Sequence, residues 1–158
     1  MARRPRTGQS GFSLLELVIV VVIIGIIAAI AIPRMSRGSA GAADASLAGN
    51  LTVMRKAIDM YAAEHNGTFP AVATVSNQLT LYSSAAGATS ATKDTTYIYG
   101  PYLQRVPSLP VGAAKGNTGV AAAAGSGVGW IYNATAGTIT ANTTATETDA
   151  SGKKYSDY

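Results

Sequence analysis

A single carboxylate stands inside the most apolar stretch of the chain. Residues 12–32 are apolar except for Ser13 and Glu16. A helix of that length spans about 30 Å, the thickness of one bilayer hydrocarbon core. An acidic side chain deep in a membrane helix costs about 3 kcal/mol. Glu16 therefore either reaches the interface as a residue without a role, or it forms an ion pair that offsets this cost.

A glycine and several basic residues precede this apolar stretch. Gly11 abuts Phe12, and Glu16 is the fifth residue counted from Phe12. Residues 11–17 read Gly-Phe-Ser-Leu-Leu-Glu-Leu, and the basic residues ahead of them are Arg3, Arg4 and Arg6. This arrangement resembles the class III signal of type IV pilins and of type II secretion pseudopilins.

The resemblance implies specific chemistry at the start of the stretch. A membrane-embedded prepilin peptidase would cut between Gly11 and Phe12 and methylate the new amino group of Phe12. Glu16 would then pair with the Phe12 amine of a neighbouring subunit during assembly. Opposite charges attract strongly in a low-dielectric medium, and each is costly there alone. Such a pair favours assembly and fixes the axial step between subunits.

An ordinary secretory signal is the rival interpretation of the same segment. Residues 29–31, Ala-Ile-Ala, would then be the small-residue cleavage site. The apolar run is longer than a typical signal core, and Glu16 would sit inside that core without a reason. Positive residues ahead of the span predict a cytoplasmic N-terminus, with the remainder of the chain facing outward.

Charge and cysteine content narrow the function classes. The net charge is +4, but three of the 12 basic residues precede Gly11, and without them the balance against 8 acidic residues is +1. The basic pI is therefore a topology signal and not a nucleic-acid footprint. The chain has no cysteine, which excludes disulfides, thiolate metal sites and a cysteine nucleophile. Many pilins close a C-terminal loop with a disulfide, so this absence favours pseudopilins.

One long helix is predicted from residue 12 to about residue 66. Gly25 and Pro33 are weak points, where the helix could bend or unwind when subunits pack into a filament. Beyond Pro33 an apolar stripe recurs at spacings of three and four residues. Asn66-Gly67 is a stop signal. The stripe is Ala40, Ala43, Leu47, Leu51, Met54, Ile58, Tyr61 and His65.

The rest of the chain predicts a small β-containing domain. Residues 127–132 and 138–142 read as two strands joined by a hairpin, with Trp130 on the face that covers the helix. Residues 95–103 also have strand composition, broken at residues 100–101, Gly-Pro. Residues 77–82 could be a helix or a strand, residues 112–127 a flexible loop, and residues 143–158 a frayed polar tail. The fold class is thus α+β: a long N-terminal helix packed on a small antiparallel sheet.

Residues 100–107, Gly-Pro-Tyr-Leu-Gln-Arg-Val-Pro, resemble a segment of type II secretion major pseudopilins. An Asp-Pro-Trp-Gly sequence usually follows in that family, but residues 109–112 here read Leu-Pro-Val-Gly. The family's C-terminal loops often hold calcium, and this departure puts calcium in doubt. Asp94, Glu147 and Asp149 could contribute ligands, but they read as scattered surface acids. No cofactor or metal is expected.

Signs of an enzyme or of a nucleic-acid-binding protein are weak. The sequence shows no nucleophile-base pair, no phosphate loop, no metal cluster and no adjacent carboxylate pair. His65, the one histidine, is expected to cap the helix or lie at the surface. A carbohydrate-binding role for Trp130 is less favoured than a core role. The basic residues are too widely spaced along the sequence to predict a nucleic-acid-binding surface.

The sequence predicts a filament subunit in four parts: a cleaved leader (1–11), a transmembrane and filament-core helix (12–32), its amphipathic continuation (33–66) and a C-terminal domain (67–158). The resemblance implies a bacterial inner-membrane protein with a periplasmic domain that later joins an extracytoplasmic filament. Its partners would be copies of itself, the peptidase, an assembly platform with its ATPase, and minor pseudopilins. A type II secretion pseudopilin is favoured, and a type IV pilin is the alternative.

Overall fold

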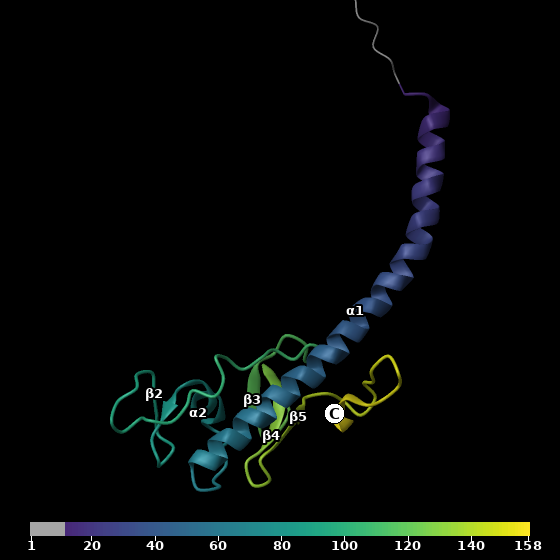
Figure 1. Cartoon of the computed structure of the whole chain (residues 1–158). Helices are drawn as coiled ribbons and strands as arrows, with labels where there is room; N and C mark the ends of the chain where they lie inside the picture. Colours follow the sequence, from purple (N-terminus) through teal and green to yellow (C-terminus); the bar gives the residue numbers. More distant parts are fainter. Residues whose placement is uncertain (1–11) are drawn as a thin grey trace, which may run out of the picture. The chain divides into compact units, whose positions relative to one another are not determined.

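The computed structural model describes the backbone of residues 12–158 and their side chains outside residues 32–37. Gly11 and the predicted leader therefore lie outside the described residues. The described residues divide into two compact units, with the boundary between residues 38 and 39. The predicted α+β fold class is confirmed, with one long apolar helix followed by a short helix and two small sheets (Figure 1).

The first helix, α1, runs from Leu14–Glu64, within about two residues of the predicted bounds. Its backbone is helical at both Gly25 and Pro33. Asn66 and Gly67 follow with φ of 55° and 78°, and the Gly67 N–H donates to the Ala62 carbonyl at 2.8 Å. This left-handed termination is the reason the Asn-Gly pair marked the end of the helix correctly.

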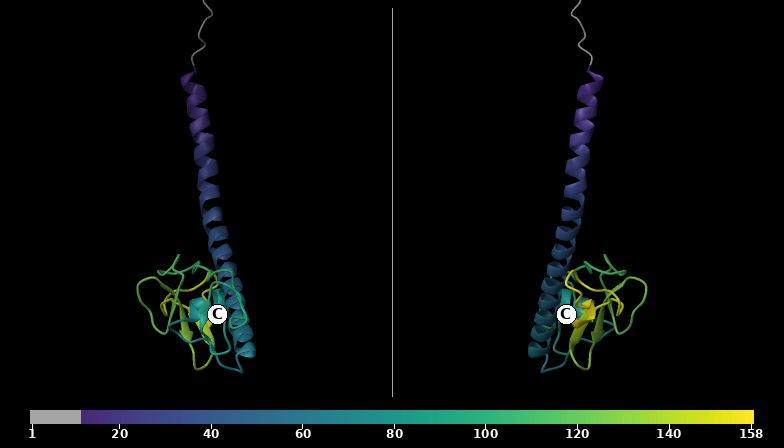
Figure 2. Two further views of the ribbon diagram at one scale, coloured as in Figure 1. Left: turned by 90° about the vertical axis from the view of Figure 1, so that its left-hand side faces the viewer. Right: turned by 90° about the vertical axis from the view of Figure 1, so that its right-hand side faces the viewer.

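The core of the second unit lies against one face of α1. Leu47, Leu51, Met54, Ile58 and Tyr61 are buried, as the predicted stripe requires. Ala43 is partly buried, but Ala40 is exposed, so the stripe begins one turn later than expected. The strands and loops lie along this one face of the helix (Figure 2). The sheet contributes further buried residues, Trp130, Tyr132, Ile139 and Ala141.

The larger sheet has the order β3-β4-β5. β4 (Val128–Asn133) and β5 (Thr138–Ala141) form the predicted antiparallel hairpin. Trp130 and Tyr132 are fully buried on it, so the expected core role is confirmed. The indole N–H donates to the Pro107 carbonyl at 2.8 Å, and the Tyr132 hydroxyl to the Pro70 carbonyl at 3.0 Å.

The third strand corrects two predictions. β3 (Gly119–Ala121) pairs with β4 in parallel, so this sheet is mixed and not purely antiparallel. It also lies inside the segment predicted to be a flexible loop. The glycines that suggested flexibility permit a close backbone approach instead. The Gly119 N–H donates to the Gly127 carbonyl at 3.0 Å, and a Cβ on Gly119 would lie 2.5 Å from that oxygen.

A second small sheet and a short helix complete the domain. Residues 77–80 of the ambiguous segment are helical and lie in α2 (Val75–Thr80), whereas residue 82 begins β1 (Tyr82–Ser83), which pairs antiparallel with β2 (Thr89–Ser90). The strand predicted over residues 95–103 is wrong, since only an isolated Ser83–Tyr99 bridge forms there. The chain turns away because the Tyr102 and Leu103 N–H groups both donate to the Leu79 carbonyl at 2.9 Å.

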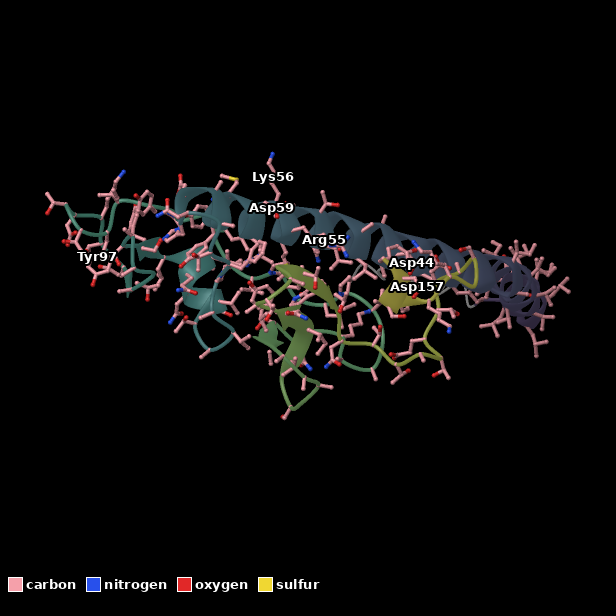
Figure 3. All side chains as sticks on the ribbon, turned by 90° about the horizontal axis from the view of Figure 1, so that it is seen from below. Asp44, Arg55, Lys56, Asp59, Tyr97 and Asp157 are labelled. Atoms are coloured by element: carbon pink, nitrogen blue, oxygen red, sulfur yellow. The ribbon has the colours of Figure 1, made fainter. Side chains whose placement is uncertain are left out.

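The predicted frayed tail is also wrong, because residues 143–158 are tied to α1. The tail ends in a 3₁₀ helix, Tyr155–Asp157. The Tyr155 hydroxyl donates to Asp44 at 2.8 Å, and the Arg55 guanidinium donates to the main-chain oxygen of Tyr158 at 2.7 Å. Asp44 and Arg55 lie along the part of α1 that the tail follows (Figure 3). We call Asp44, Arg55, Asp149, Tyr155 and Tyr158 the C-terminal clasp.

Candidate functional site: the start of the first helix

The N-terminal part of α1 exposes apolar side chains on every side. The window Leu14–Ala31 has a mean hydropathy of 3.2, and none of it is buried within the chain. Phe12, just ahead of the helix, is 90% exposed. Water-facing helices of globular proteins carry such residues on one face only. By length and composition this segment could cross a membrane.

Ser13 and Glu16 form a capping box at the start of the helix. The Ser13 N–H donates to the Glu16 carboxylate, Oε2, at 2.9 Å. The Ser13 hydroxyl oxygen accepts from the Leu15 N–H at 3.3 Å, and the Ser13 carbonyl accepts from the Leu17 N–H at 3.2 Å. Backbone N–H groups at a helix start have no partner within the helix, so this exchange satisfies two of them.

Glu16 was predicted as a site residue from the sequence, whereas Ser13 was noted only as polar and was given no role. The signal was present, because Ser-Leu-Leu-Glu ahead of an apolar run is the Ser-x-x-Glu pattern of a capping box. Within the described residues, no hydrogen bond to the other Glu16 oxygen, Oε1, and no ion pair to this carboxylate is formed. Among the described residues, the hydrogen bond from its own helix thus engages only the Oε2 oxygen of the carboxylate.

The remaining residues predicted for this site are placed as follows. Gly11 lies outside the described residues, and the side chain of Pro33 does as well. A Cβ added at Gly25 would meet nothing within 4 Å, so nothing in the described chain requires a glycine there. The structure brings Ser13 and Glu16 together and brings neither Gly25 nor Pro33 to them.

The other titratable candidates have structural partners. His65 is buried and stacks on Tyr61 with ring centroids 3.8 Å apart. The expected surface position is therefore wrong, whereas the alternative role as a helix cap agrees with a ring nitrogen that meets a carbonyl of the last turn of α1. Its Nδ1 lies 2.8 Å from the Tyr61 carbonyl oxygen, and its Nε2 lies 3.1 Å from that of Ser84. These contacts join the end of α1 to Ser84, the residue that follows β1, and leave His65 in a packing role.

Three carboxylates bind backbone or side-chain donors of their own loops. Hydrogen bonds from the Tyr97 and Thr96 N–H groups lower the pKa of Asp94. The Thr144 N–H does the same for Glu147, and Ser151, with Tyr158, lowers the pKa of Asp149. In the described part of the chain, no three His, Asp or Glu side chains gather where they could hold a metal ion.

Comparison with known proteins gives one match, and it falls on this site. Residues 6–32 match the family described as the prokaryotic N-terminal methylation motif. This is the class III prepilin motif of the type IV pilin and pseudopilin superfamily. No curated protein and no solved structure matches the chain.

The motif defines the class of protein to which the start of the chain corresponds. It is the motif of pilin-like structural subunits, not of enzymes. Such subunits are processed by prepilin peptidase, are N-methylated and assemble into filaments. The apolar helix and the motif together are similar to the N-terminal segment of membrane-anchored pilins. The match ends at residue 32 and does not separate secretion pseudopilins from type IV pilins.

Proposed function

We propose that this chain is a filament subunit whose N-terminal helix serves first as a membrane anchor and then as the filament core. Residues 1–11 form the leader, cut between Gly11 and Phe12, and the Phe12 amine is methylated. Residues 12–32 cross the inner membrane from a cytoplasmic N-terminus. Residues 33–66 continue the helix, and residues 67–158 form the periplasmic domain. The observation that carries this proposal is Glu16, a lone carboxylate in an exposed apolar helix that bears the prepilin motif.

The assembly step follows from the charges that processing creates. Cleavage gives Phe12 a cationic amine close to the Glu16 carboxylate. Each charge costs several kcal/mol in hydrocarbon when it is alone, and a pair in contact recovers much of that cost. When the amine belongs to another copy, the recovered energy joins two subunits. A repeated heterologous contact of this kind generates an open helical filament.

Gly25 and Pro33 have a separate proposed role in that filament. Glycine gives little intrinsic support to a helix, and proline removes the N–H that would bond the carbonyl of residue 29. The helix between them is therefore the part that bends or unwinds at the lowest cost when subunits pack. The apolar surroundings of the filament core would favour such local adjustment only where few hydrogen bonds are lost.

Within this class we favour a pseudopilin of a type II secretion system. The C-terminal domain is short, the chain has no cysteine, and residues 100–103 resemble the segment of major pseudopilins. Its partners would be an inner-membrane assembly platform with its ATPase and the minor pseudopilins. A type IV pilin of a surface appendage is the second candidate. Neighbouring genes for an outer-membrane secretin, without a retraction ATPase, would favour secretion.

The direct test of the assembly role is the Glu16→Val variant. We expect normal cleavage after Gly11, seen as the intact mass of a chain that begins at Phe12 with one added methyl group. We also expect filament yield in sheared fractions to fall at least about tenfold, because the amine loses its partner. Asp157→Asn is the matched control, since it removes an exposed carboxylate from the tail. Normal filaments from Glu16→Val would refute the charge-pair step.

A further inference from the structure

We propose that Ser13 is a positioning residue for assembly. It holds Glu16 so that one carboxylate oxygen caps its own helix while the other is left for the amine of an incoming copy. This inference rests on the proposed function and specifies how its central contact is prepared. It concerns only the first turn of α1, where Ser13 and Glu16 lie three residues apart.

Ser13 contributes all three of its polar groups to the first turn. Its N–H donates to Glu16 Oε2 at 2.9 Å, its hydroxyl oxygen accepts from the Leu15 N–H at 3.3 Å, and its carbonyl accepts from the Leu17 N–H at 3.2 Å. The hydroxyl and the carbonyl fix the backbone of Ser13 at the helix start. That backbone in turn directs its N–H at the carboxylate.

The surroundings make this cap stronger than an ordinary surface cap. Backbone N–H groups in a bilayer core find no water, so each needs a partner within the protein. The Glu16 carboxylate is the partner of the Ser13 N–H, and this hydrogen bond holds the carboxylate in a single orientation. Freely rotating Glu side chains lose considerable conformational freedom when they are fixed by a partner. Here most of that loss occurs in the separate subunit, before assembly.

The geometry leaves the carboxylate able to serve two donors. An ionised carboxylate has two oxygens and about four lone-pair sites, and the cap occupies one oxygen. An ammonium from another copy can therefore bind Oε1 while the cap on Oε2 persists. The cap thus prepares Glu16 for its partner and does not compete with it.

A first experiment examines the separate subunit, where no filament is needed. Amide hydrogen exchange of the processed full chain is followed by NMR in detergent micelles. We expect the Ser13 amide to exchange at least about tenfold faster in Glu16→Val than in the unmodified chain. Glu16→Gln should keep most of the protection, since a glutamine oxygen also accepts in a capping box. Equal exchange in the unmodified chain and Glu16→Val would overturn the proposal.

A second experiment separates positioning from charge in the filament. Ser13→Ala removes the hydroxyl but keeps the Glu16 charge, and Ser13→Thr restores a hydroxyl. Filament yield is divided by the amount of cleaved subunit from intact mass, because Ser13 lies near the cleavage site. We expect Ser13→Ala to lower this ratio about fivefold or more and Ser13→Thr to return it to within about twofold. A ratio for Ser13→Ala within twofold of the unmodified chain overturns the positioning role.

The two experiments distinguish this inference from the proposed function. If the unmodified chain does not begin at Phe12 or forms no filament, the proposed function fails, and the inference fails with it. If the unmodified chain assembles and Glu16→Val does not, while Ser13→Ala assembles normally, only the positioning role is lost.

Discussion

The Glu16 side chain meets two requirements that normally conflict. A carboxylate needs water or a cation, but its helix needs partners for N–H groups that lie among apolar side chains. The capping box answers the second requirement with one oxygen, and the proposed amine of another copy answers the first with the other. In this proposal Ser13 orients Glu16 so that one carboxylate can fill both roles. The residue type at position 13 therefore matters as much as that at position 16.

Residue-scale constraints in the domain come from glycines at close backbone contacts. Gly129 lies in β4, where an added Cβ would be 2.3 Å from the Asn117 carbonyl oxygen. Gly129→Ala must shift the loop that contains Asn117. We therefore expect the free energy of unfolding of the full chain in detergent to fall by about 1–3 kcal/mol. Urea titration followed by tryptophan fluorescence measures this, since Trp130 is the neighbouring residue and the one tryptophan.

Gly125→Ala is the matched control for this substitution. A Cβ there would meet only the Val128 side chain at 3.6 Å, an ordinary van der Waals distance. We expect its unfolding midpoint to stay close to that of the unmodified chain. An equal loss of stability in both variants would contradict the argument from the Asn117 contact.

At the scale of elements, one helix carries two different surfaces. The part from Leu14 to Ala31 is apolar all round and unburied, whereas the part in the second unit buries a single stripe. The stripe could be read from the sequence because helical periodicity is a local property. The same periodicity identifies which side chains the domain covers, and its loss identifies the segment that is apolar all round and that we propose as membrane anchor and filament core.

The C-terminal clasp is the element whose stability should respond to alkaline pH. Hydrogen bonding to Asp149 raises the pKa of Tyr158 to about 12. Burial, with the bond to Asp44, raises that of Tyr155 to about 12. The folded chain favours the neutral phenols, so this stabilisation is complete below the ordinary pKa of 10.0 and is lost as the pH rises through about 12.

We therefore expect the tail to detach from α1 between about pH 10 and pH 12. The tyrosinate absorbance of the full chain, followed with amide exchange in residues 144–158, measures this. The Tyr155→Phe, Tyr158→Phe double variant serves as the reference, because its tail lacks both hydroxyl bonds and should exchange quickly at lower pH. Equal protection of the tail in the double variant would show that these bonds do not hold it.

Elements that depend on distant contacts were the ones the sequence did not predict correctly. The 12–66 helix, its termination at Asn66-Gly67 and the β4–β5 hairpin were predictable, since capping, periodicity and turn chemistry are local. β3 was not, because its parallel pairing depends on glycines that allow Gly119 and Gly127 to approach. The docking of the tail on α1 was not predictable from the sequence either. Its polar composition suggested fraying, whereas Tyr155 bonds to Asp44 and Arg55 bonds to Tyr158, each across more than 100 positions of the chain.

At the scale of the whole molecule, the chain joins a membrane-type helix to a domain without cysteines. The motif accounts for the first part and reaches only to residue 32. The domain contributes a buried core, carboxylates that accept hydrogen bonds and a tail bound to α1, and its described residues hold no group of three His, Asp or Glu side chains placed to bind a metal ion. In the proposed filament, assembly would depend on the helix, and the domain would form the outer surface.

The central claim is a contact between the Phe12 amine of one subunit and the Glu16 carboxylate of another. Filaments grown from a mixture of two preparations, one with ¹⁵N-labelled phenylalanine and the other with ¹³C-labelled glutamate, measure it by solid-state NMR. The proposal predicts a dipolar coupling between the methylated amine nitrogen and the Glu16 carboxyl carbon at ion-pair distance, about 4 Å or less. Because the labels are on different chains, only an intersubunit contact can produce it. Assembled filaments in which that coupling is absent would contradict the account.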